Sequence, residues 1–336
     1  MARTKTVLGL DIGTHSVCAV ELTGSGDDVS VTGVGWERIP SPDLVEDTVL
    51  AVISDNNLDA KNLVTSVSGR SVIVRYVTMV SMPPEELNSA VYYEANKYIP
   101  WEVDDVQLDC QQLGGVDERG QMRVLIVAAK RDLIDEHVGV LNRIKLHPKM
   151  IDVDLFALGN AFELCNLRGE LAAEDEAVAL VDIGSSKTSI CIMRGNEDSF
   201  TRPIYTAGES ITDAVARRFN EQTQDVEVMK EDPGDAVEVI REAMLPVFEE
   251  IGGEVRLCFD YYENQFDQQV RRVYLSGGTI QFPGAVEELG RIFDVETVRF
   301  TPFEMLDVAA TDEVVLREKA SDMVVALGLA SRIRGL

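Results

Sequence analysis

The sequence predicts an α/β protein built from two related lobes, and three observations support this fold class. Residues 7–22 and 178–193 echo each other about half a chain length apart, reading VLGLDIGTHSVCAVEL and VALVDIGSSKTSICIM. In each copy an apolar run ends at Asp, a turn of Gly and small hydroxyl residues follows, and a second run returns, as in a β-hairpin. Strand-like and helix-like segments alternate elsewhere. A duplicated lobe that opens with a hairpin is the simplest account.

The first lobe is expected to contain 1–80, 148–177 and 311–336. After its hairpin, the apolar patterns predict a third strand at 29–36, a helix at 44–53 and strands at 64–68 and 72–77. An inserted subdomain is predicted at 81–147. Its first helix follows Pro83 and Pro84 and carries Glu85 and Glu86 in the first turn, where the helix dipole favours acidic residues.

The second lobe is expected to contain 178–207 and 271–310, with a helical subdomain at 208–270 between them. The segment 208–270 is mostly helical in pattern, and its longest helix is predicted at 247–266. The apolar strand at 272–275 then runs into Ser276-Gly277-Gly278-Thr279.

Composition excludes several classes of protein. With 336 residues, 45% of them hydrophobic, the chain is too apolar to be disordered. Its formal net charge of −27 repels nucleic acid and anionic lipid, and no basic patch interrupts it, so we expect no nucleic-acid partner. The longest apolar runs fall well short of the roughly 18 residues that span a bilayer. We therefore expect a cytoplasmic protein without direct membrane insertion.

The five cysteines predict neither a disulfide framework nor a zinc site. They are odd in number, widely separated and in no C-x-x-C pair. We expect them to be small buried residues.

The two hairpin turns are candidate phosphate-binding elements. Glycine lets backbone N–H groups approach anionic oxygens closely, and neighbouring hydroxyls can donate further hydrogen bonds. The carboxylates of Asp11 and Asp182 repel phosphate, so we expect them to act through Mg²⁺ and its water shell. One such turn alone is also the pattern of an ordinary tight turn, but its duplication favours a shared phosphate site. The candidate residues are Asp11, Gly13, Thr14, Asp182, Gly184, Ser185 and Ser186.

Two further elements could complete a nucleotide site. In the run of Gly277, Gly278 and Thr279, the two consecutive glycines allow a flat ligand to lie against the backbone. A Gly pair is a weak signal by itself. Glu227 and Lys230 are spaced i, i+3 on a predicted helix and could reach a ribose or base, although surface helices often carry such a pair.

The order of these motifs resembles the actin, Hsp70 and sugar-kinase superfamily. It is carried by DIGT at 11–14, DIGSS at 182–186, SGGT at 276–279 and VALGLA at 325–330. The inserted block resembles the PilM family of type IV pilus assembly proteins, relatives of the division protein FtsA. Matching stretches include VSMPPEELNSAVYYEANKYIPWEVDDVQLD, IDVDLFALGNAFEL and VRRVYLSGGTIQFPGAVEELGRIF. The resemblance covers essentially the whole chain.

This resemblance implies an actin-like (ribonuclease-H-like) two-lobe fold with an inserted FtsA/PilM-type 1C subdomain. It also implies ATP and Mg²⁺ between the lobes, with the two hairpins on the phosphates, Gly277, Gly278 and Thr279 along adenosine, and Glu227 and Lys230 near the ribose. Asp11 and Asp182 are the expected Mg²⁺ residues.

Turnover is expected to be weak or absent, and the catalytic residues stay unassigned. Many relatives place Lys near the position of Cys18, and strong hydrolases of the superfamily usually carry a Gly pair where Ser185 and Ser186 stand. Asp152 and Asp154 lie near the right connector, but their positions are typical of a strand end and a helix cap. His15, if protonated, could replace the missing cation; otherwise it is an exposed turn residue.

The resemblance implies a cytoplasmic ATP-binding scaffold of the inner-membrane platform that assembles type IV pili. The expected partners are the cytosolic N-terminal peptide of a PilN-type inner-membrane protein and other platform components, which would hold the protein at the membrane. Two alternatives remain. An FtsA-like filament protein predicts an amphipathic C-terminal helix, whereas this sequence ends in SRIRGL; a small-molecule kinase or phosphatase needs a catalytic Asp, for which no candidate stands out.

Overall fold

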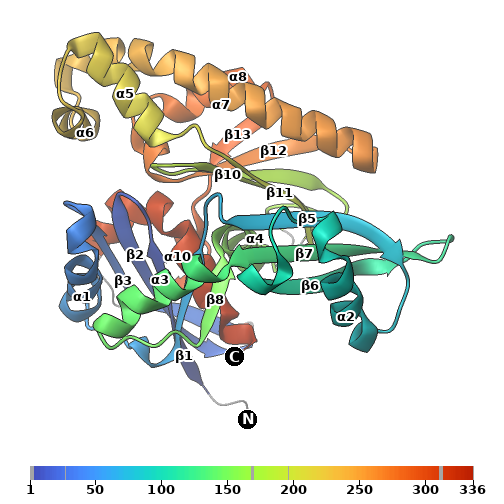
Figure 1. Ribbon diagram of the computed structural model, residues 1–336. Helices are drawn as coiled ribbons and strands as arrows, with labels where there is room; N and C mark the ends of the chain where they lie inside the picture. The colour runs from blue at the N-terminus through green and yellow to red at the C-terminus, as the bar shows by residue number, and fades with distance from the viewer. Residues whose placement is uncertain (1–3, 27, 168–169, 196, 310–312, 336) are drawn as a thin grey trace. The chain divides into compact units, whose positions relative to one another are not determined.

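The computed structural model describes residues 4–26, 28–167, 170–195, 197–309 and 313–335 (Figure 1). The chain divides into a larger unit, Met1–Ser66 with Pro148–Leu336, and a smaller unit, Val67–His147. The insert predicted at 81–147 therefore begins earlier, because β5 (Val72–Val80) pairs along its whole length with β7 (Gln121–Lys130). The predicted boundary at 310–311 lies outside the described residues.

In the larger unit, the first sheet begins with the predicted hairpin, β1 (Lys5–Ile12) and β2 (Ser16–Ser25). Its strand order is β14-β3-β2-β1-β4-β8. Asp11 pairs with Cys18 at the turn end of this hairpin. Helix α1 (Val45–Asp55) packs against β2 and β3. The remaining strands are β3 (Asp28–Arg38), β4 (Leu63–Val67), β8 (Met150–Val153) and β14 (Asp307–Val308).

The second sheet repeats the order of the first. It opens with the hairpin of β9 (Ala177–Ile183) and β10 (Thr188–Arg194), and its order is β11-β10-β9-β12-β13. This matches the series β3-β2-β1-β4-β8, so the predicted duplication is confirmed. The other strands are β11 (Glu197–Ile204), β12 (Val270–Ser276) and β13 (Glu296–Arg299).

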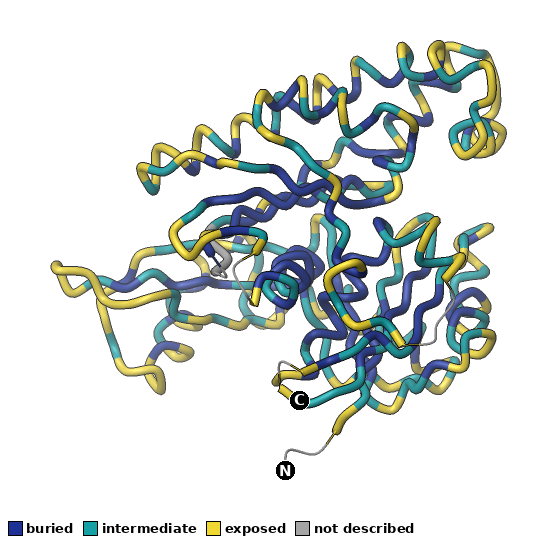
Figure 2. Tube along the Cα trace, turned by 180° about the vertical axis from the view of Figure 1, so that it is seen from behind, coloured by how far each residue is buried: buried dark blue, intermediate teal, exposed yellow. Residues whose placement is uncertain are grey.

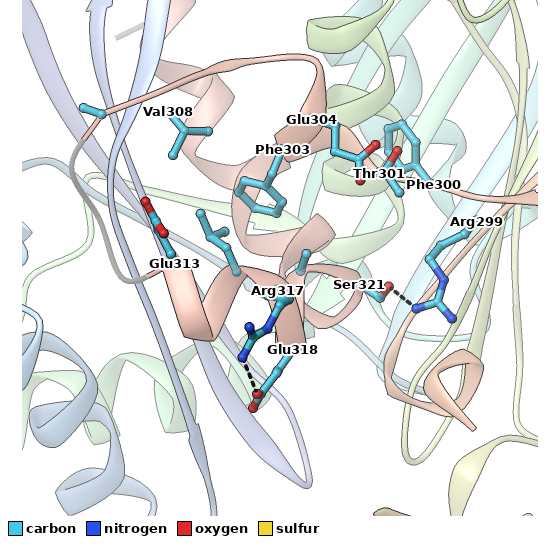
Figure 3. Close-up of a pocket in the computed structure, with 13 residues that line it drawn as sticks. Arg299, Phe300, Thr301, Phe303, Glu304, Val308, Glu313, Arg317, Glu318 and Ser321 are labelled. Carbon is cyan, nitrogen blue, oxygen red and sulfur yellow. Dashed lines mark hydrogen bonds and ion pairs between the residues drawn. The ribbon is translucent and has the colours of Figure 1, made fainter. Parts of the chain in front are cut away.

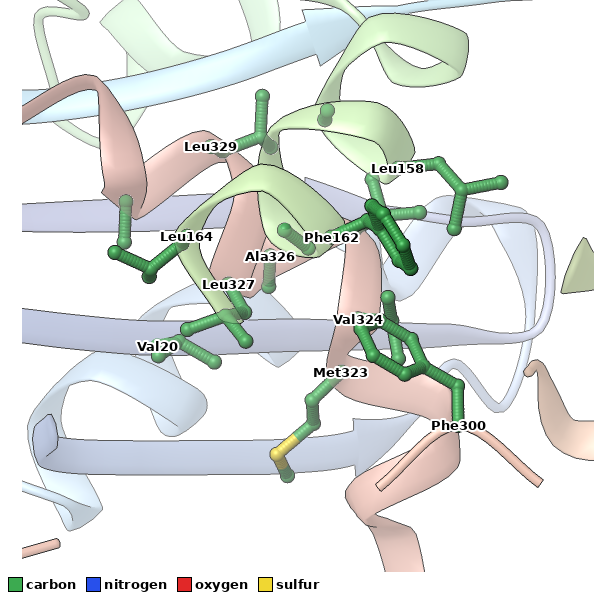
Figure 4. Packing of buried hydrophobic residues seen from close by; sticks show 14 of the residues in the cluster. Val20, Leu158, Phe162, Leu164, Phe300, Met323, Val324, Ala326, Leu327 and Leu329 are labelled. Atoms are coloured by element: carbon green, nitrogen blue, oxygen red, sulfur yellow. The ribbon is translucent and has the colours of Figure 1, made fainter. Parts of the chain in front are cut away.

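Two buried helices, α4 (Asp154–Cys165) and α10 (Val324–Ala330), pack on each other (Figure 4). Helix α10 contacts β1 and β2 of the first sheet, and α4 contacts β10 and β11 of the second. One hydrophobic cluster joins them to side chains of both hairpins, including Val20 and Leu180. The helices cross closely, because a Cβ on Gly328 would lie 1.7 Å from the carbonyl oxygen of Ala157. The two lobes thus share one core along this crossing.

The opposite face of the second sheet is covered by helices α5 (Gly208–Phe219), α7 (Val237–Phe266) and α8 (Ala285–Phe293). Ile240, Phe248 and Val255 line the buried stripe of α7, while its outer side is exposed in Figure 2. Helix α6 (Thr223–Glu231) follows α5 at the end of this layer. The segment predicted to be helical, 208–270, is helical over most of its length.

The smaller unit is an antiparallel sheet of order β5-β7-β6, with β6 at Val106–Val116. Helices α2 (Pro84–Glu94) and α3 (Arg131–Arg143) accompany it. Met79, Leu87, Val91, Met122 and Ile126 belong to its core. Among the residues described in either unit, no helix combines the length and apolar character needed to cross a membrane.

Candidate functional site

A cavity of about 700 Å³ in the larger unit is bordered by both hairpin turns, the loop after β12 and helix α6. All the predicted site residues except Ser186 line this cavity. They are Asp11, Gly13, Thr14, Asp182, Gly184, Ser185, Glu227, Lys230, Gly277, Gly278 and Thr279. Residues predicted from separate motifs, far apart in the sequence, therefore meet around one space.

The two hairpin turns are closed by the same backbone hydrogen bond. The N–H of Gly13 donates to the carbonyl of Ser16 at 2.9 Å, and the N–H of Gly184 donates to that of Lys187 at 3.1 Å. A Cβ on Gly13 would lie 3.0 Å from the Ser16 carbonyl, so the first turn has little room for a side chain there. Each turn follows an Asp near the end of its strand and presents a small hydroxyl residue to the cavity.

Three aspartates, Asp11, Asp182 and Asp322, line the cavity. Desolvation raises the pKa of Asp182 to about 7, although a hydrogen bond from Ser276 Oγ at 2.7 Å opposes the shift. Desolvation likewise raises the pKa of Asp11 to about 6, opposed by Lys187, and that of Asp322 to about 6, opposed by Lys319. Carboxylates that are costly to ionise alone are suited to a divalent cation, and oxygen ligands are those Mg²⁺ prefers.

Lys187 is a charged residue that the sequence analysis missed. Its ammonium forms an ion pair with Asp154 at the start of α4, and its side chain is only 16% exposed. Desolvation lowers its pKa to about 8, while Asp11 acts in the opposite direction. A Lys within the second turn is the signal in the sequence that could have indicated this cation. The resemblance to relatives directed attention to the first turn, near Cys18. The expected cap role of Asp154 is wrong, because its carboxylate pairs with Lys187 and the residue before α4 is Val153.

The loop after β12 lies very close to the second hairpin. Gly277 has a left-handed φ of 92°, and a Cβ there would lie 2.4 Å from the carbonyl oxygen of Ile183. The N–H of Gly277 donates to the carbonyl of Ser321 at 2.8 Å. The next residues form a short 3₁₀ helix, Gly278–Gln281, in which Gln281 donates to Asp322 at 2.8 Å. Only glycine fits at Gly277 without strain or displacement.

Glu227 and Lys230 form an ion pair of 2.8 Å on α6, as their spacing suggested. Thr212 of α5 contacts both, and Lys230 Nζ donates to its hydroxyl at 2.6 Å. Desolvation opposes ionisation of Glu227, but Lys230 and Thr212 together lower its pKa. The pair is therefore held in place at the cavity wall as a polar, charge-balanced surface.

His15 lies in the first turn and is half-buried rather than exposed. Desolvation lowers its pKa, with Glu227 opposing the shift, so the ring is neutral at neutral pH. It does not supply the cation that the first hairpin lacks. Two other missed residues, Trp36 and Lys319, lie nearby on the cavity wall, with the Lys319 ammonium 4.2 Å from the centre of the Trp36 ring.

A second cavity of about 660 Å³ lies next to this wall (Figure 3). Phe300, Phe303 and Val308 give it an apolar side, while Arg317 pairs with Glu318 at 3.3 Å along another side. None of the predicted site residues lines it.

Comparison with known proteins identifies the family to which the chain belongs. The model of a family described as type IV pilus assembly protein PilM matches residues 9–334. A solved structure of a PilM-PilN type IV pilus biogenesis complex is similar at 26% identity with a TM-score of 0.84, and 98% of each chain is covered.

A more distant structure is the ethanolamine utilization protein EutJ from Carboxydothermus hydrogenoformans. It has 16% identity and a TM-score of 0.54, and the match covers 98% of this chain and 90% of that chain. This likeness extends only to the fold. Together with the repeated sheets and the two crossing helices, the matches establish an actin-like fold, and the chain belongs to the PilM family of type IV pilus assembly proteins.

Proposed function

We propose that this actin-like pilus assembly protein binds Mg-ATP in the cavity between its hairpin turns and acts as a cytoplasmic scaffold of the pilus inner-membrane platform. In this role it binds the cytosolic N-terminal peptide of a PilN-type membrane protein. The observation that carries the nucleotide proposal is the convergence of two Asp-x-Gly-hydroxyl turns, one from each lobe, on a single cavity.

The chemistry of the cavity walls fits a nucleotide. Its volume of about 700 Å³ lies within the roughly 300–1,000 Å³ typical of small-molecule sites. Turn amides and the hydroxyls of Thr14 and Ser185 suit phosphate oxygens. Asp11 and Asp182 suit a hydrated Mg²⁺, which would neutralise phosphate charge when bound. The close backbone at Gly277 and Gly278 leaves a flat surface for adenosine, and Glu227 and Lys230 offer polar partners for the ribose.

Binding with little or no hydrolysis is supported by the positions of the candidate bases. Asp154 is paired with Lys187, and Asp152 is paired with Arg332 at 2.5 Å. A general base needs a lone pair within hydrogen-bond reach of the attacking water. Neither carboxylate is among the described residues that line the cavity.

The partner proposal rests on the similar PilM-PilN complex and on charge. A protein with a net charge of −27 favours a peptide that carries Arg or Lys. Binding through a membrane-anchored peptide would also bring a scaffold to the membrane without a span of its own.

Nucleotide binding can be tested by thermal unfolding and calorimetry of the purified chain. Mg-ATP at about 100 times its Kd should add roughly 2.7 kcal/mol of stability. Asp182→Asn should weaken Mg-ATP binding by at least about tenfold, or about 1.4 kcal/mol. Asp175→Asn, which makes the same change at an exposed position just before β9, is the matched control and should bind as the wild type does. A wild-type protein without measurable Mg-ATP affinity contradicts the proposal.

Partner binding can be tested by fluorescence anisotropy. A labelled peptide from the cytosolic end of a PilN-type protein encoded in the same genome should bind the chain, with a scrambled peptide of equal charge as control. Equal binding of both peptides would reduce the interaction to charge alone. Lack of binding with and without Mg-ATP would remove the scaffold proposal.

A further inference from the structure

A carboxylate of the chain itself lies between the two hairpin turns. Glu209 Oε1 accepts a hydrogen bond from Thr14 Oγ1 of the first turn at 3.4 Å and from Ser185 Oγ of the second turn at 3.2 Å. One anionic oxygen is therefore shared by hydroxyls from both lobes.

The backbone holds Glu209 in this place. At the start of α5, the N–H of Gly208 donates to the carbonyl of Gly184 at 3.0 Å, and the N–H of Glu209 donates to that of Ser185 at 2.8 Å. A Cβ on Gly208 would lie 2.9 Å from the Gly184 carbonyl, so the helix start is packed directly on the second turn. The Glu209 side chain itself is exposed and can move away from the hydroxyls.

We propose that Glu209 is a specificity-determining residue that occupies the position of a phosphate oxygen in the ligand-free site and makes polyphosphate binding depend on a divalent cation. This inference rests on the proposed nucleotide site. Each hydroxyl carries one proton and cannot donate to the carboxylate and to a phosphate at once. A metal-free triphosphate must therefore displace Glu209 and then lie beside its negative charge.

A divalent cation changes this balance. With Mg²⁺ on the phosphates, the displaced carboxylate lies next to a neutralised group or can bind the water shell of the metal. Glu209 thus penalises free ATP more than Mg-ATP. Asp182 does not compete with phosphate in this way. Among the described contacts, its carboxylate accepts a hydrogen bond from Ser276 and none from Thr14 or Ser185.

The experiment compares ATP and inorganic tripolyphosphate, each with excess Mg²⁺ and with EDTA, by isothermal titration calorimetry. Glu209→Gln should bind both metal-free ligands about tenfold more tightly than the wild type, equal to about 1.4 kcal/mol. The Mg²⁺ dependence of affinity should shrink by a similar factor. Asp213→Asn, which removes the same charge from an exposed position one turn later on α5, should match the wild type.

A second variant separates charge from competition for the hydroxyls. Glu209→Ala removes both effects and should gain at least as much affinity for metal-free ligand as Glu209→Gln, whose amide oxygen can still accept hydrogen bonds. Circular dichroism and thermal unfolding verify that both variants are folded.

The outcomes separate the two proposals. If the wild type binds Mg-ATP but both Glu209 variants bind metal-free ligand no better than it does, the role of Glu209 is overturned and the nucleotide site stands. If no protein binds any of the ligands, both proposals fall.

Discussion

The two hairpin turns are alike in backbone and different in charge. Both are closed by a glycine N–H at the same place, and both follow an Asp whose pKa is raised by desolvation. The second turn carries Lys187, which is nearly buried behind it, whereas the first turn carries the neutral His15. Duplication thus repeats the geometry of the turn, but the balancing cation comes from one copy.

Lys187 of the second turn also acts on carboxylates of the first lobe. Lys187 pairs with Asp154 and also opposes the raised pKa of Asp11 in the other lobe. The first lobe has a different arrangement around Asp322, whose raised pKa is opposed by Lys319, three residues earlier in the chain.

Lys187→Met should have the largest effect on stability. It leaves Asp154 buried without its cation and removes the positive charge near Asp11. Breaking a buried ion pair in this way costs about 3–5 kcal/mol. Chemical denaturation should show this loss, and Lys187→Met with Asp154→Asn should recover much of it.

The control for this measurement is an exposed pair. Arg291→Gln breaks the contact with Glu288 on α8, where the Arg side chain is 66% exposed, and should leave the stability close to that of the wild type. If Lys187→Met costs as little as Arg291→Gln, the second turn does not depend on a buried cation.

Gly277→Ala should come next, because the second hairpin is packed against this residue. Gly277 has φ 92° and ψ 165°, a backbone region essentially restricted to glycine, so an Ala there costs about 1–3 kcal/mol. Displacing the Ile183 carbonyl, 2.4 Å from the new Cβ, adds about 1–3 kcal/mol. Gly26→Ala, at a φ of 63° with no atom within 4 Å of the added Cβ, is the control for a positive φ without a clash. Equal losses of stability for the two variants would mean that the loop can move away from the hairpin.

Asp322→Asn should remove a pH dependence of stability. Because the folded pKa of Asp322 is raised from 3.8 to about 6, its contribution is fully present below about pH 4 and is lost as pH rises through about 6. The wild type loses this contribution as the pH rises, whereas Asp322→Asn does not. The stability of the variant relative to the wild type should therefore increase over this pH range by on the order of 2 kcal/mol. Urea unfolding from pH 4 to pH 8 measures it, and a constant difference would contradict the assignment.

His15→Lys should have the smallest effect, on nucleotide affinity. This variant gives the first turn a cation, as Lys187 gives one to the second turn. At a partly solvated site, one added charge should tighten Mg-ATP binding by a few fold, about 1 kcal/mol or less, and the gain should shrink at high salt. An unchanged affinity at low salt would show that the first turn needs no cation.

Much of the site could be predicted from the sequence because its parts are local motifs. Asp11 to Thr14, Asp182 to Ser185 and Gly277 to Thr279 each lie within one turn, and their duplication or glycine content marks them. Lys187 and Glu209 could not be assigned in this way, because their roles depend on partners in other elements, Asp154 in one case and Thr14 in the other.

The fold shows the same division between local and long-range information. The two hairpins and the long helices follow from local patterns of apolar residues. The start of the insert was placed too late because β5 reads as a strand in either unit. Only its pairing with β7, from Val72 with Ala129 to Val80 with Gln121, assigns it to the smaller one.

The crossing of α4 and α10 ties the carboxylates near the cavity to a contact distant from them in the sequence. Asp154 starts one helix beside the second turn, and Asp322 lies just before the other on the cavity wall. A side chain at position 328 would meet the Ala157 carbonyl and force the two helices apart. The positions of both helix starts, and of the carboxylates that they carry, therefore depend on a glycine that does not line the cavity.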